Sequence, residues 1–228
     1  MAQSYAELHS WSNFTFLEGG SHPEELIDHA AALGLRALAL TDRDGLYGMV
    51  RFAARARLRG VEAIVGSELT FQDGGRLVLL VEDDRGYAHL CELVSIAQLR
   101  GSKGDARLHF EDLAGRTQGL IALSGGEHGR IERAFGSADQ NAAVAEARRL
   151  QTLFGDRFYL ELQQHLTAEE TRRNEYLVEL ARALRLPLVA TNAVVYACKE
   201  DAAVADVLGA SVLVFSSCPP CTLTVFRS

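Results

Sequence analysis

The sequence predicts an α/β fold, either a barrel of alternating strands and helices or an open doubly wound sheet. Short apolar runs with strand character alternate with amphipathic helical patterns along about 190 residues, the order that parallel strands joined by crossover helices produce. Hydrophobic residues make up 48% and charged residues 23% of the 228 residues, so a large core can form. Polar clusters follow several apolar runs, at the strand ends where such folds carry out chemistry.

The first half of the chain begins with a short strand over 5–9. A helix over 23–33 follows, with Ser21 as its N-cap and Gly34 as its stop, and then a buried strand over 35–41. The next helix, 45–59, is expected to turn apolar side chains inward, Leu46, Val50, Phe52, Ala53 and Leu58. Its outer face is expected to be basic and solvated, with Arg51, Arg55, Arg57 and Arg59. After a strand over 61–65, residues 69–71 pair with 77–81 across a glycine turn.

The second half continues the alternation. A helix over 86–99 leads into an irregular, glycine-containing stretch over 100–118, where we expect a mobile loop. A strand over 120–124, a helix over 141–154, a strand over 158–162, a helix over 169–184 and a strand over 186–191 complete the pattern. No internal repeat or linker divides the chain, so residues 1–210 are predicted to form one domain.

Residues 211–228 break this pattern and are assigned to an atypical, irregular tail. No charged residue occurs from Ser211 to Phe226, and Cys218-Pro-Pro-Cys221 interrupts the apolar run. A single CxxC pair is a weak signal for redox or zinc chemistry, because zinc needs two further ligands. Truncation or a reading-frame change is an alternative explanation for this composition.

Composition narrows the classes of function. The formal charge of −7 gives no general attraction to a phosphate backbone, so this domain is not expected to provide the main binding surface for a nucleic acid. Four unevenly spaced cysteines do not make a disulfide framework, and neither a signal peptide nor a membrane-spanning run is present. We therefore expect a soluble, cytoplasmic protein with no membrane partner.

Three polar residues near the amino terminus are the first site candidates. His9 ends the first predicted strand, Glu18 lies in the following loop, and Asp42 follows the next strand. The carboxyl ends of barrel strands converge on one mouth, so these side chains are expected to be neighbours. Asp42, in Thr-Asp-Arg-Asp-Gly, is equally well interpreted as a turn former or cap.

Four stretches closely resemble the polymerase-and-histidinol-phosphatase (PHP) domain. They are residues 5–9 (YAELH), 12–26 (SNFTFLEGGSHPEEL), 37–48 (ALALTDRDGLYG) and 189–192 (VATN). The version that looks closest opens bacterial DNA polymerase III alpha subunits, particularly the error-prone alpha-type polymerases. The similarity covers roughly residues 5–210, in order, and implies a distorted (β/α)7, TIM-like barrel.

The resemblance also implies a site. Active PHP domains hold a cluster of metal ions with histidines and carboxylates at the barrel mouth and hydrolyse phosphoesters. The positions that match the ligands of the family are His9, Glu18, Asp42, Glu68 and His165. The positions where other side chains replace ligands are Trp11, Arg43, Arg76, Ala193 and Val195. None of these replacements ligates a divalent ion, so the retained residues are expected to be a vestigial site.

The replacements suggest what holds such a mouth together. Glu18, Asp42 and Glu68 would repel one another unless positive charge is supplied. We expect Arg43 and Arg76 to supply it by pairing with these carboxylates, and Trp11 to fill the vacated volume. No cofactor is then expected, or at most one zinc or manganese ion.

The resemblance points to the amino-terminal PHP domain of an error-prone alpha-type DNA polymerase, a nucleotidyltransferase of DNA replication and repair after DNA damage. The polymerase active site is absent from these residues, so the domain is expected to be inactive and structural. It would contact the core regions of the parent polymerase, and DNA only through that parent. The alternatives are a free-standing metal-dependent phosphoesterase, acting as phosphatase or 3′–5′ exonuclease, and an interaction module used alone.

Overall fold

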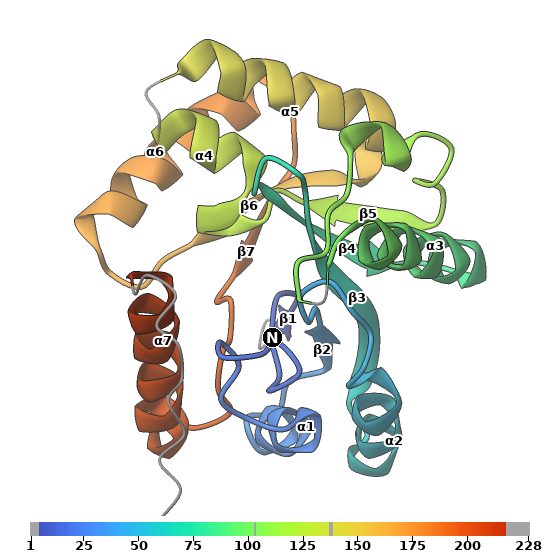
Figure 1. Ribbon diagram of the computed structural model, residues 1–228, viewed down its shortest axis with the longest axis vertical. Coiled ribbons are helices and arrows are strands. Elements are labelled where there is room, and N and C mark those ends of the chain that lie inside the picture. Colours follow the sequence, from blue (N-terminus) through green and yellow to red (C-terminus); the bar gives the residue numbers. More distant parts are fainter. Residues whose placement is uncertain (1–4, 103, 137–138, 218–228) are drawn as a thin grey trace, which may run out of the picture.

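Seven strands follow one another around a barrel in the order of the sequence (Figure 1). The computed structural model describes residues 5–102, 104–136 and 139–217. The strands are β1 (Ala6–Glu7), β2 (Ala37–Leu40), β3 (Glu62–Thr70), β4 (Arg76–Val81), β5 (Leu120–Leu123), β6 (Phe158–Gln163) and β7 (Leu188–Thr191). The predicted distorted, TIM-like barrel is confirmed.

Strand β4 is the exception to the parallel arrangement. It runs antiparallel to both β3 and β5, whereas the other neighbouring strands are parallel. The hairpin pairs Leu69 with Leu77, as predicted, but residues 61–65 and 69–71 belong to one long strand, β3. The link between β3 and β4 is too short for a crossover, so β4 has to reverse direction. The predicted hairpin is thus confirmed, and only the inference of parallel strands, drawn from strand and helix order, does not hold at β4.

The barrel closes through a polar seam between β1 and β7. Val194 N–H donates to the His9 carbonyl at 3.0 Å, and Trp11 N–H donates to the Val194 carbonyl at 2.8 Å. Below these bonds, the Glu7 carboxylate accepts the Asn192 N–H at 3.0 Å and the His9 N–H at 2.9 Å. Because β1 is only two residues long, a buried carboxylate replaces part of the missing ladder.

Helices surround the barrel (Figure 1). They are α1 (Pro23–Ala32), α2 (Met49–Arg59), α3 (Asp84–Arg100), α4 (Arg130–Gly136), α5 (Gln140–Phe154), α6 (Ala168–Leu184) and α7 (Ala202–Ser217). The short helix α4 is not predicted by the sequence pattern. His22, not Ser21, occupies the N-cap position of α1, because the Ser21 hydroxyl instead donates to Asp201 at 2.9 Å.

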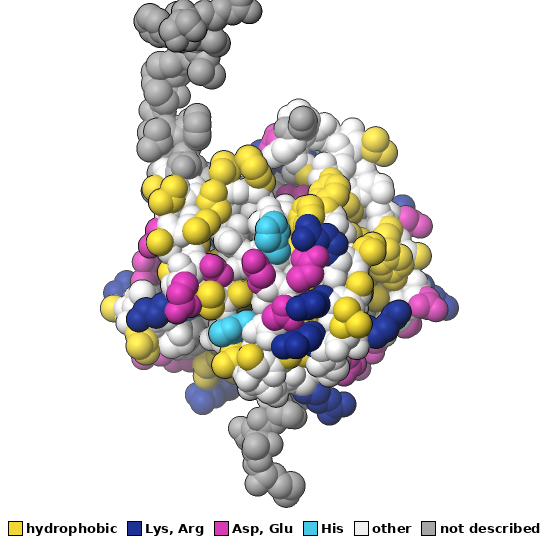
Figure 2. Space-filling view, turned by 90° about the horizontal axis from the view of Figure 1, so that it is seen from below, with side chains coloured by type: hydrophobic (Ala, Val, Ile, Leu, Met, Phe, Trp, Pro, Cys, Tyr) yellow, Lys and Arg dark blue, Asp and Glu magenta, His cyan; other side chains and the backbone are white. Residues whose placement is uncertain are grey.

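Helix α2 buries only part of the set that the pattern assigns to the core: Phe52 is buried as predicted, but Val50 and Leu58 are not. Its buried side chains are Met49, Phe52 and Ala56, whereas Val50 is 82% and Leu58 77% exposed. The basic face predicted to be solvated remains at the surface, where Arg51, Arg57 and Arg59 are exposed and Arg55 is half-buried, and part of it faces α1. Its arginines form ion pairs there: Arg51 with Glu24, and Arg55 and Arg59 with Asp28. From below, this region of the surface shows interleaved acidic and basic side chains (Figure 2).

The largest apolar cluster fills the space between the sheet and helices α3, α5 and α6. Leu79, Leu93, Phe154 and Phe158 are among its fully or almost fully buried members. A second cluster joins α1 and α2 to β2. The stretch 100–118, expected to be irregular, contains a 3-10 turn at Phe110–Leu113 and is tied to the hairpin by two backbone bonds, Leu108 N–H to Thr70 O and Gln72 N–H to Leu108 O. The sheet and helices α3, α5 and α6 are thus closely packed against each other.

The carboxyl-terminal part differs from the predicted tail. Helix α7 continues through Ser217, so residues 211–217 are helical rather than irregular. The Cys218 to Cys221 motif lies outside the described residues. Within the described ranges, no helix combines the length and apolar character that crossing a bilayer requires.

Candidate functional site

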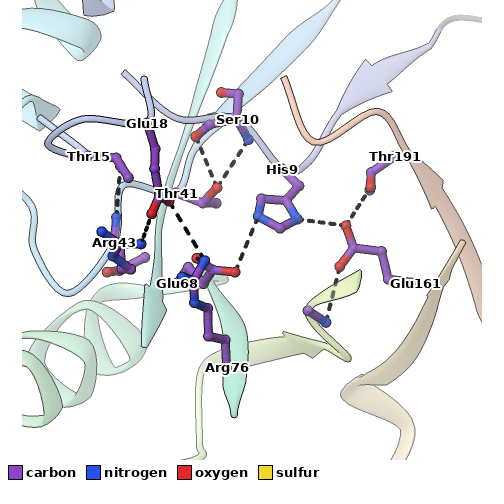
Figure 3. A network of polar contacts seen from close by, with 12 residues as sticks. His9, Ser10, Thr15, Glu18, Thr41, Arg43, Glu68, Arg76, Glu161 and Thr191 are labelled. Atoms are coloured by element: carbon purple, nitrogen blue, oxygen red, sulfur yellow. Dashed lines mark hydrogen bonds and ion pairs between the residues drawn. The ribbon is translucent and has the colours of Figure 1, made fainter. Parts of the chain in front are cut away.

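The loops at the carboxyl ends of the parallel strands bring several candidate residues to one mouth. A pocket of about 180 Å³ is lined by His9, Trp11, Glu68, His165 and Ala193. Glu18 reaches the same network through arginine, as Figure 3 shows. Asp42 and Val195 are not among the residues lining this pocket. Five of the ten predicted positions thus line one pocket, and Glu18 contacts this network through Arg76.

His9 lies at the bottom of the mouth, where it is 1% exposed. Its Nδ1–H donates to Glu161 Oε1 at 2.8 Å, and its Nε2 lies 3.9 Å from Glu68 Oε1. Burial would lower the pKa of His9, but Glu161 and Glu68 outweigh burial and raise this pKa to about 9. The Trp11 ring packs edge-on against the imidazole, with centroids 5.4 Å apart. His9 is accordingly a cation held between two carboxylates.

Glu161 is the main site residue that the sequence reasoning missed. It is 1% exposed, and its Oε1 accepts from His9, from the Thr191 hydroxyl and from Gln163 Nε2 at 3.0 Å. Its Oε2 accepts the N–H of Gly125 at 3.1 Å. Burial would raise the pKa of Glu161, but the His9 cation and these hydrogen bonds lower it. The available signal was a charged residue inside an apolar strand, because such a residue is rarely buried without a partner.

Two arginines bind the carboxylates of Glu18 and Glu68 (Figure 3). Arg76 Nη1 lies 3.2 Å from Glu68 Oε2 and 3.8 Å from Glu18 Oε2. Arg43 Nη1 donates to the other oxygen of Glu18. Burial raises the pKa of Glu68, although His9 and Arg76 oppose this effect. The arrangement is an alternating chain of charges: Arg43, Glu18, Arg76, Glu68, His9 and Glu161.

Asp42 is not part of this chain of charges. Its Oδ1 accepts the Ser12 N–H at 2.7 Å and the Thr15 hydroxyl at 2.9 Å, and its Oδ2 accepts the Ser12 hydroxyl at 2.8 Å. Burial raises the pKa of Asp42, while these hydrogen bonds oppose the shift. Asp42 thus anchors the distant loop that carries Glu18, and the expected pairing of Asp42 with an arginine is wrong.

His165 lies at the outer edge of the pocket, where its side chain is 51% exposed. Its Nδ1–H donates to Glu170 Oε1 at 2.6 Å and its Nε2–H to the Asn192 carbonyl at 2.9 Å. The hydrogen bond to Glu170, followed by that to Asn192, raises the pKa of His165. Both ring nitrogens are therefore occupied by bonds that fix the loop after β6 against the loop after β7.

The replaced positions after β7 act through their backbone. Ala193 has a φ of 46°, a left-handed conformation that favours Asn, Asp and Gly over other residues. The Val195 carbonyl accepts the N–H of Gly20 at 2.7 Å, which joins this segment to the first loop. The backbone of the mouth is thus maintained without polar side chains at these positions.

The donor set does not fit a cluster of metal ions. Among residues 5–102, 104–136 and 139–217, no three His, Cys, Asp or Glu side chains are arranged to hold an ion. Of the retained candidates, only His9 Nε2 and Glu68 Oε1 are buried atoms without a hydrogen-bond partner. A catalytic zinc ion takes three protein ligands as a rule, so two free atoms beside a guanidinium are too few for a multinuclear centre.

Comparisons with known proteins identify related sequences. Residues 7–165 match the PHP domain family. The error-prone DNA polymerase of Pseudomonas fluorescens Pf-5 is 43% identical over 190 residues, which are 82% of this chain and 17% of that protein. The error-prone DNA polymerase of Ralstonia nicotianae GMI1000 is 39% identical over 212 residues, 90% of this chain and 20% of that protein. The chain thus spans about a fifth of the length of these relatives.

Solved structures share the fold at low sequence identity. The lesion-specific endonuclease EndoQ of Pyrococcus furiosus aligns with a TM-score of 0.54 at 13% identity, over 84% of this chain and 48% of that chain. A two-domain protein of Bacteroides vulgatus, described as containing a PHP-like metal-dependent phosphoesterase, aligns with a TM-score of 0.54 at 15% identity, over 86% of this chain and 53% of that chain. At such identities the likeness concerns the barrel alone.

Proposed function

This chain belongs to the PHP domain family, and on that premise we propose that it is the amino-terminal, structural domain of an error-prone alpha-type DNA polymerase. The polymerases that it resembles are about five times longer than the matched region, which supports a role as one part of a larger machine. DNA synthesis then belongs to the rest of that polypeptide, in the cytoplasm. This domain braces the polymerase and reaches DNA only through it.

One observation carries the proposal: the carboxylates of the mouth are paired with cations of the protein itself. Glu18 and Glu68 contact Arg43 and Arg76, and Glu161 contacts His9. In a metal-dependent mouth, bound ions neutralise such carboxylates. Here guanidinium and imidazolium groups supply that charge, and arginine cannot deprotonate to release it.

The same pairs explain a structural role. Breaking a buried ion pair leaves an uncompensated buried charge, so the pairs fix the mouth in one arrangement. Hydrolysis in this family needs a water molecule activated by metal ions, and a protonated His9 between Glu68 and Glu161 offers no base in their place. The mouth therefore holds its loops together and leaves the chemistry to the rest of the polymerase.

The proposal is tested by assays of hydrolysis. Purified protein is incubated with a generic phosphomonoester, and separately with single-stranded DNA, with added manganese or zinc. We expect no release of phosphate or nucleotide above that of the His9→Ala variant. Turnover that the His9→Ala substitution abolishes would contradict a purely structural domain.

A free-standing PHP phosphoesterase is the second candidate. The facing atoms His9 Nε2 and Glu68 Oε1, 3.9 Å apart at the pocket, favour it, because they could serve as two ligands of a single zinc or manganese ion. This candidate requires His9 to lose its proton, so ion binding should release protons and strengthen above the pKa of His9. Calorimetry in two buffers of different ionisation enthalpy measures that release.

A further inference from the structure

Helix α2 carries a second apolar face that the fold does not use. Val50, Ala54 and Leu58 are exposed, with Val50 at 82% and Leu58 at 77%, and they lie four residues apart. Side chains at this spacing form one stripe along a helix. We call these three residues the α2 outer stripe. The core contacts of α2 come from Met49, Phe52 and Ala56 instead, so the stripe has no packing role within the barrel.

The surroundings of the stripe are suited to contact with another helix. On one side, Arg51, Arg55 and Arg59 are paired with Glu24 and Asp28 of α1, so their charges are already neutralised. Tyr47, just before α2, is a further exposed aromatic residue, at 65%. Arg57 is exposed and has no ion-pair partner within the described part of the chain.

We propose that the α2 outer stripe docks an apolar helix from the rest of the polymerase polypeptide, with an acidic residue opposite Arg57. This inference rests on the proposed function, because it places the domain within a longer chain. Val50, Ala54 and Leu58 form one ridge of side chains four residues apart, of the kind that packs into a groove of a second helix.

The size of the stripe argues for a tethered occupant. From Val50 to Leu58 the helix rises about 12 Å, and a contact of that length buries a few hundred Å² at most. Stable complexes between separate molecules bury about 1,000 Å² or more, so a second copy of this chain would not remain bound. A segment of the same polypeptide needs less area, because the tether keeps its effective concentration in the millimolar range. In the relatives, about four-fifths of the polypeptide lies outside the matched region.

The experiment compares this chain alone with a chimera. In the chimera, this chain replaces the matching region of the Pseudomonas fluorescens Pf-5 error-prone polymerase. Leu58→Cys is introduced into both proteins, and Leu99→Cys on α3, where Leu99 is 88% exposed, is the matched control. Maleimide labelling is followed by peptide mass spectrometry, which separates these sites from the native cysteines. We expect Leu58→Cys to label at least tenfold more slowly in the chimera, and Leu99→Cys to label equally in both proteins.

A second pair of variants tests the same contact by charge. Val50→Glu with Leu58→Lys should leave the melting temperature of the chain alone unchanged, since both sites are exposed and the new charges suit the helix dipole. The labelled site in this test is Ala54→Cys, which docking should protect in the chimera. Adding Val50→Glu with Leu58→Lys should restore fast labelling of Ala54→Cys in the chimera, whereas adding Leu99→Lys should not.

Three results would overturn the docking proposal. The first is equal labelling of Leu58→Cys in the chain alone and in a chimera whose DNA synthesis requires this domain, which leaves the bracing role intact. The second is protection of Leu58→Cys in the chain alone together with a dimer in light scattering, which makes a second copy the occupant. The third is DNA synthesis by the chimera that survives deletion of this domain, which contradicts the bracing function and with it the docking.

Discussion

The inner and outer parts of the barrel mouth use the same kinds of ion pair in different environments. Inside, the side chains of His9, Glu68 and Glu161 are 0–1% exposed. Outside, those of Glu18 and Arg43 are 25% exposed and that of Arg76 is 15% exposed. Water can solvate an outer charge that loses its partner, but it cannot reach an inner one. Burial, more than the number of contacts, should therefore decide what each pair contributes to stability.

The largest effect is expected from removing the inner anion. Glu161→Ala leaves the His9 cation, the Gly125 N–H and the Thr191 hydroxyl without their acceptor. We expect the free energy of unfolding to fall by about 3–5 kcal/mol, as measured by urea denaturation. Glu127→Ala, at an exposed glutamate of the same pocket, is the control and should change it by less than about 0.5 kcal/mol. An equal loss of stability in Glu161→Ala and Glu127→Ala would show that burial does not decide how much a carboxylate of the mouth contributes.

The second largest effect is expected from alkaline pH, which should lower the stability of the protein through buried groups at and near the inner part of the mouth. The pKa of His9 is raised to about 9, and burial raises the pKa of Glu132, beside Ser124, to about 8. For both groups the pKa is higher in the folded state than in the unfolded state. Each group therefore contributes fully to stability below its pKa in the unfolded state, and this contribution is lost as the pH rises through its pKa in the folded state. The melting temperature should fall by roughly 5 °C or more between pH 6 and pH 9.

Glu132→Gln tests the origin of that fall. The amide cannot ionise, so the part of the decrease that occurs below pH 8 should become smaller in this variant. A profile identical to that of the unaltered protein would exclude Glu132 as a source of the pH dependence.

The arginines should give a graded result. Arg76→Met leaves the fully buried Glu68 with His9 alone, and should cost about 1–3 kcal/mol of the free energy of unfolding. Arg43→Met leaves only the partly exposed Glu18 without its closest partner, and should cost less than about 1 kcal/mol. Chemical denaturation of the two variants in parallel provides the measurement. A larger loss of stability in Arg43→Met than in Arg76→Met would contradict the expectation that burial decides what each ion pair contributes.

The smallest effect concerns the backbone beside the pocket. Ala193 keeps a φ of 46°, where a glycine avoids the strain of a Cβ atom. Ala193→Gly should therefore be neutral or stabilising, by up to about 1 kcal/mol. In contrast, Ala53→Gly within α2 should destabilise by about 0.5–1 kcal/mol. If both substitutions destabilise equally in thermal unfolding, Ala193 is not strained.

Most of the fold could be predicted from periodicity, and the errors have physical causes. The alternation of apolar runs and amphipathic helices placed α1, α3, α5 and α6 within a few residues of their observed bounds. The hairpin of β3 and β4 was predicted from its short glycine turn, whereas strand and helix order alone implies parallel strands there. Helix α2 has apolar residues on two faces, and periodicity alone cannot tell which face meets the core.

The site was predicted less completely than the fold. The resemblance identified His9, Glu68 and the arginines that replace ligands, because these lie in recognisable motifs. Glu161 was missed because it lies within a strand whose apolar neighbours suggested burial. Its role depends on the barrel closure that brings β6 opposite His9, a contact between residues 152 positions apart. The anchoring role of Asp42 likewise depends on a loop 30 positions away.

The most direct test of a mouth locked by ion pairs in place of metals is the metal content of the purified protein. The chain is equilibrated with excess zinc or manganese, passed through a desalting column and analysed by mass spectrometry for metals. The account predicts fewer than two ions per chain, with the melting temperature unchanged by a chelator. Two or more ions per chain, together with loss of those ions in His9→Ala, would contradict it.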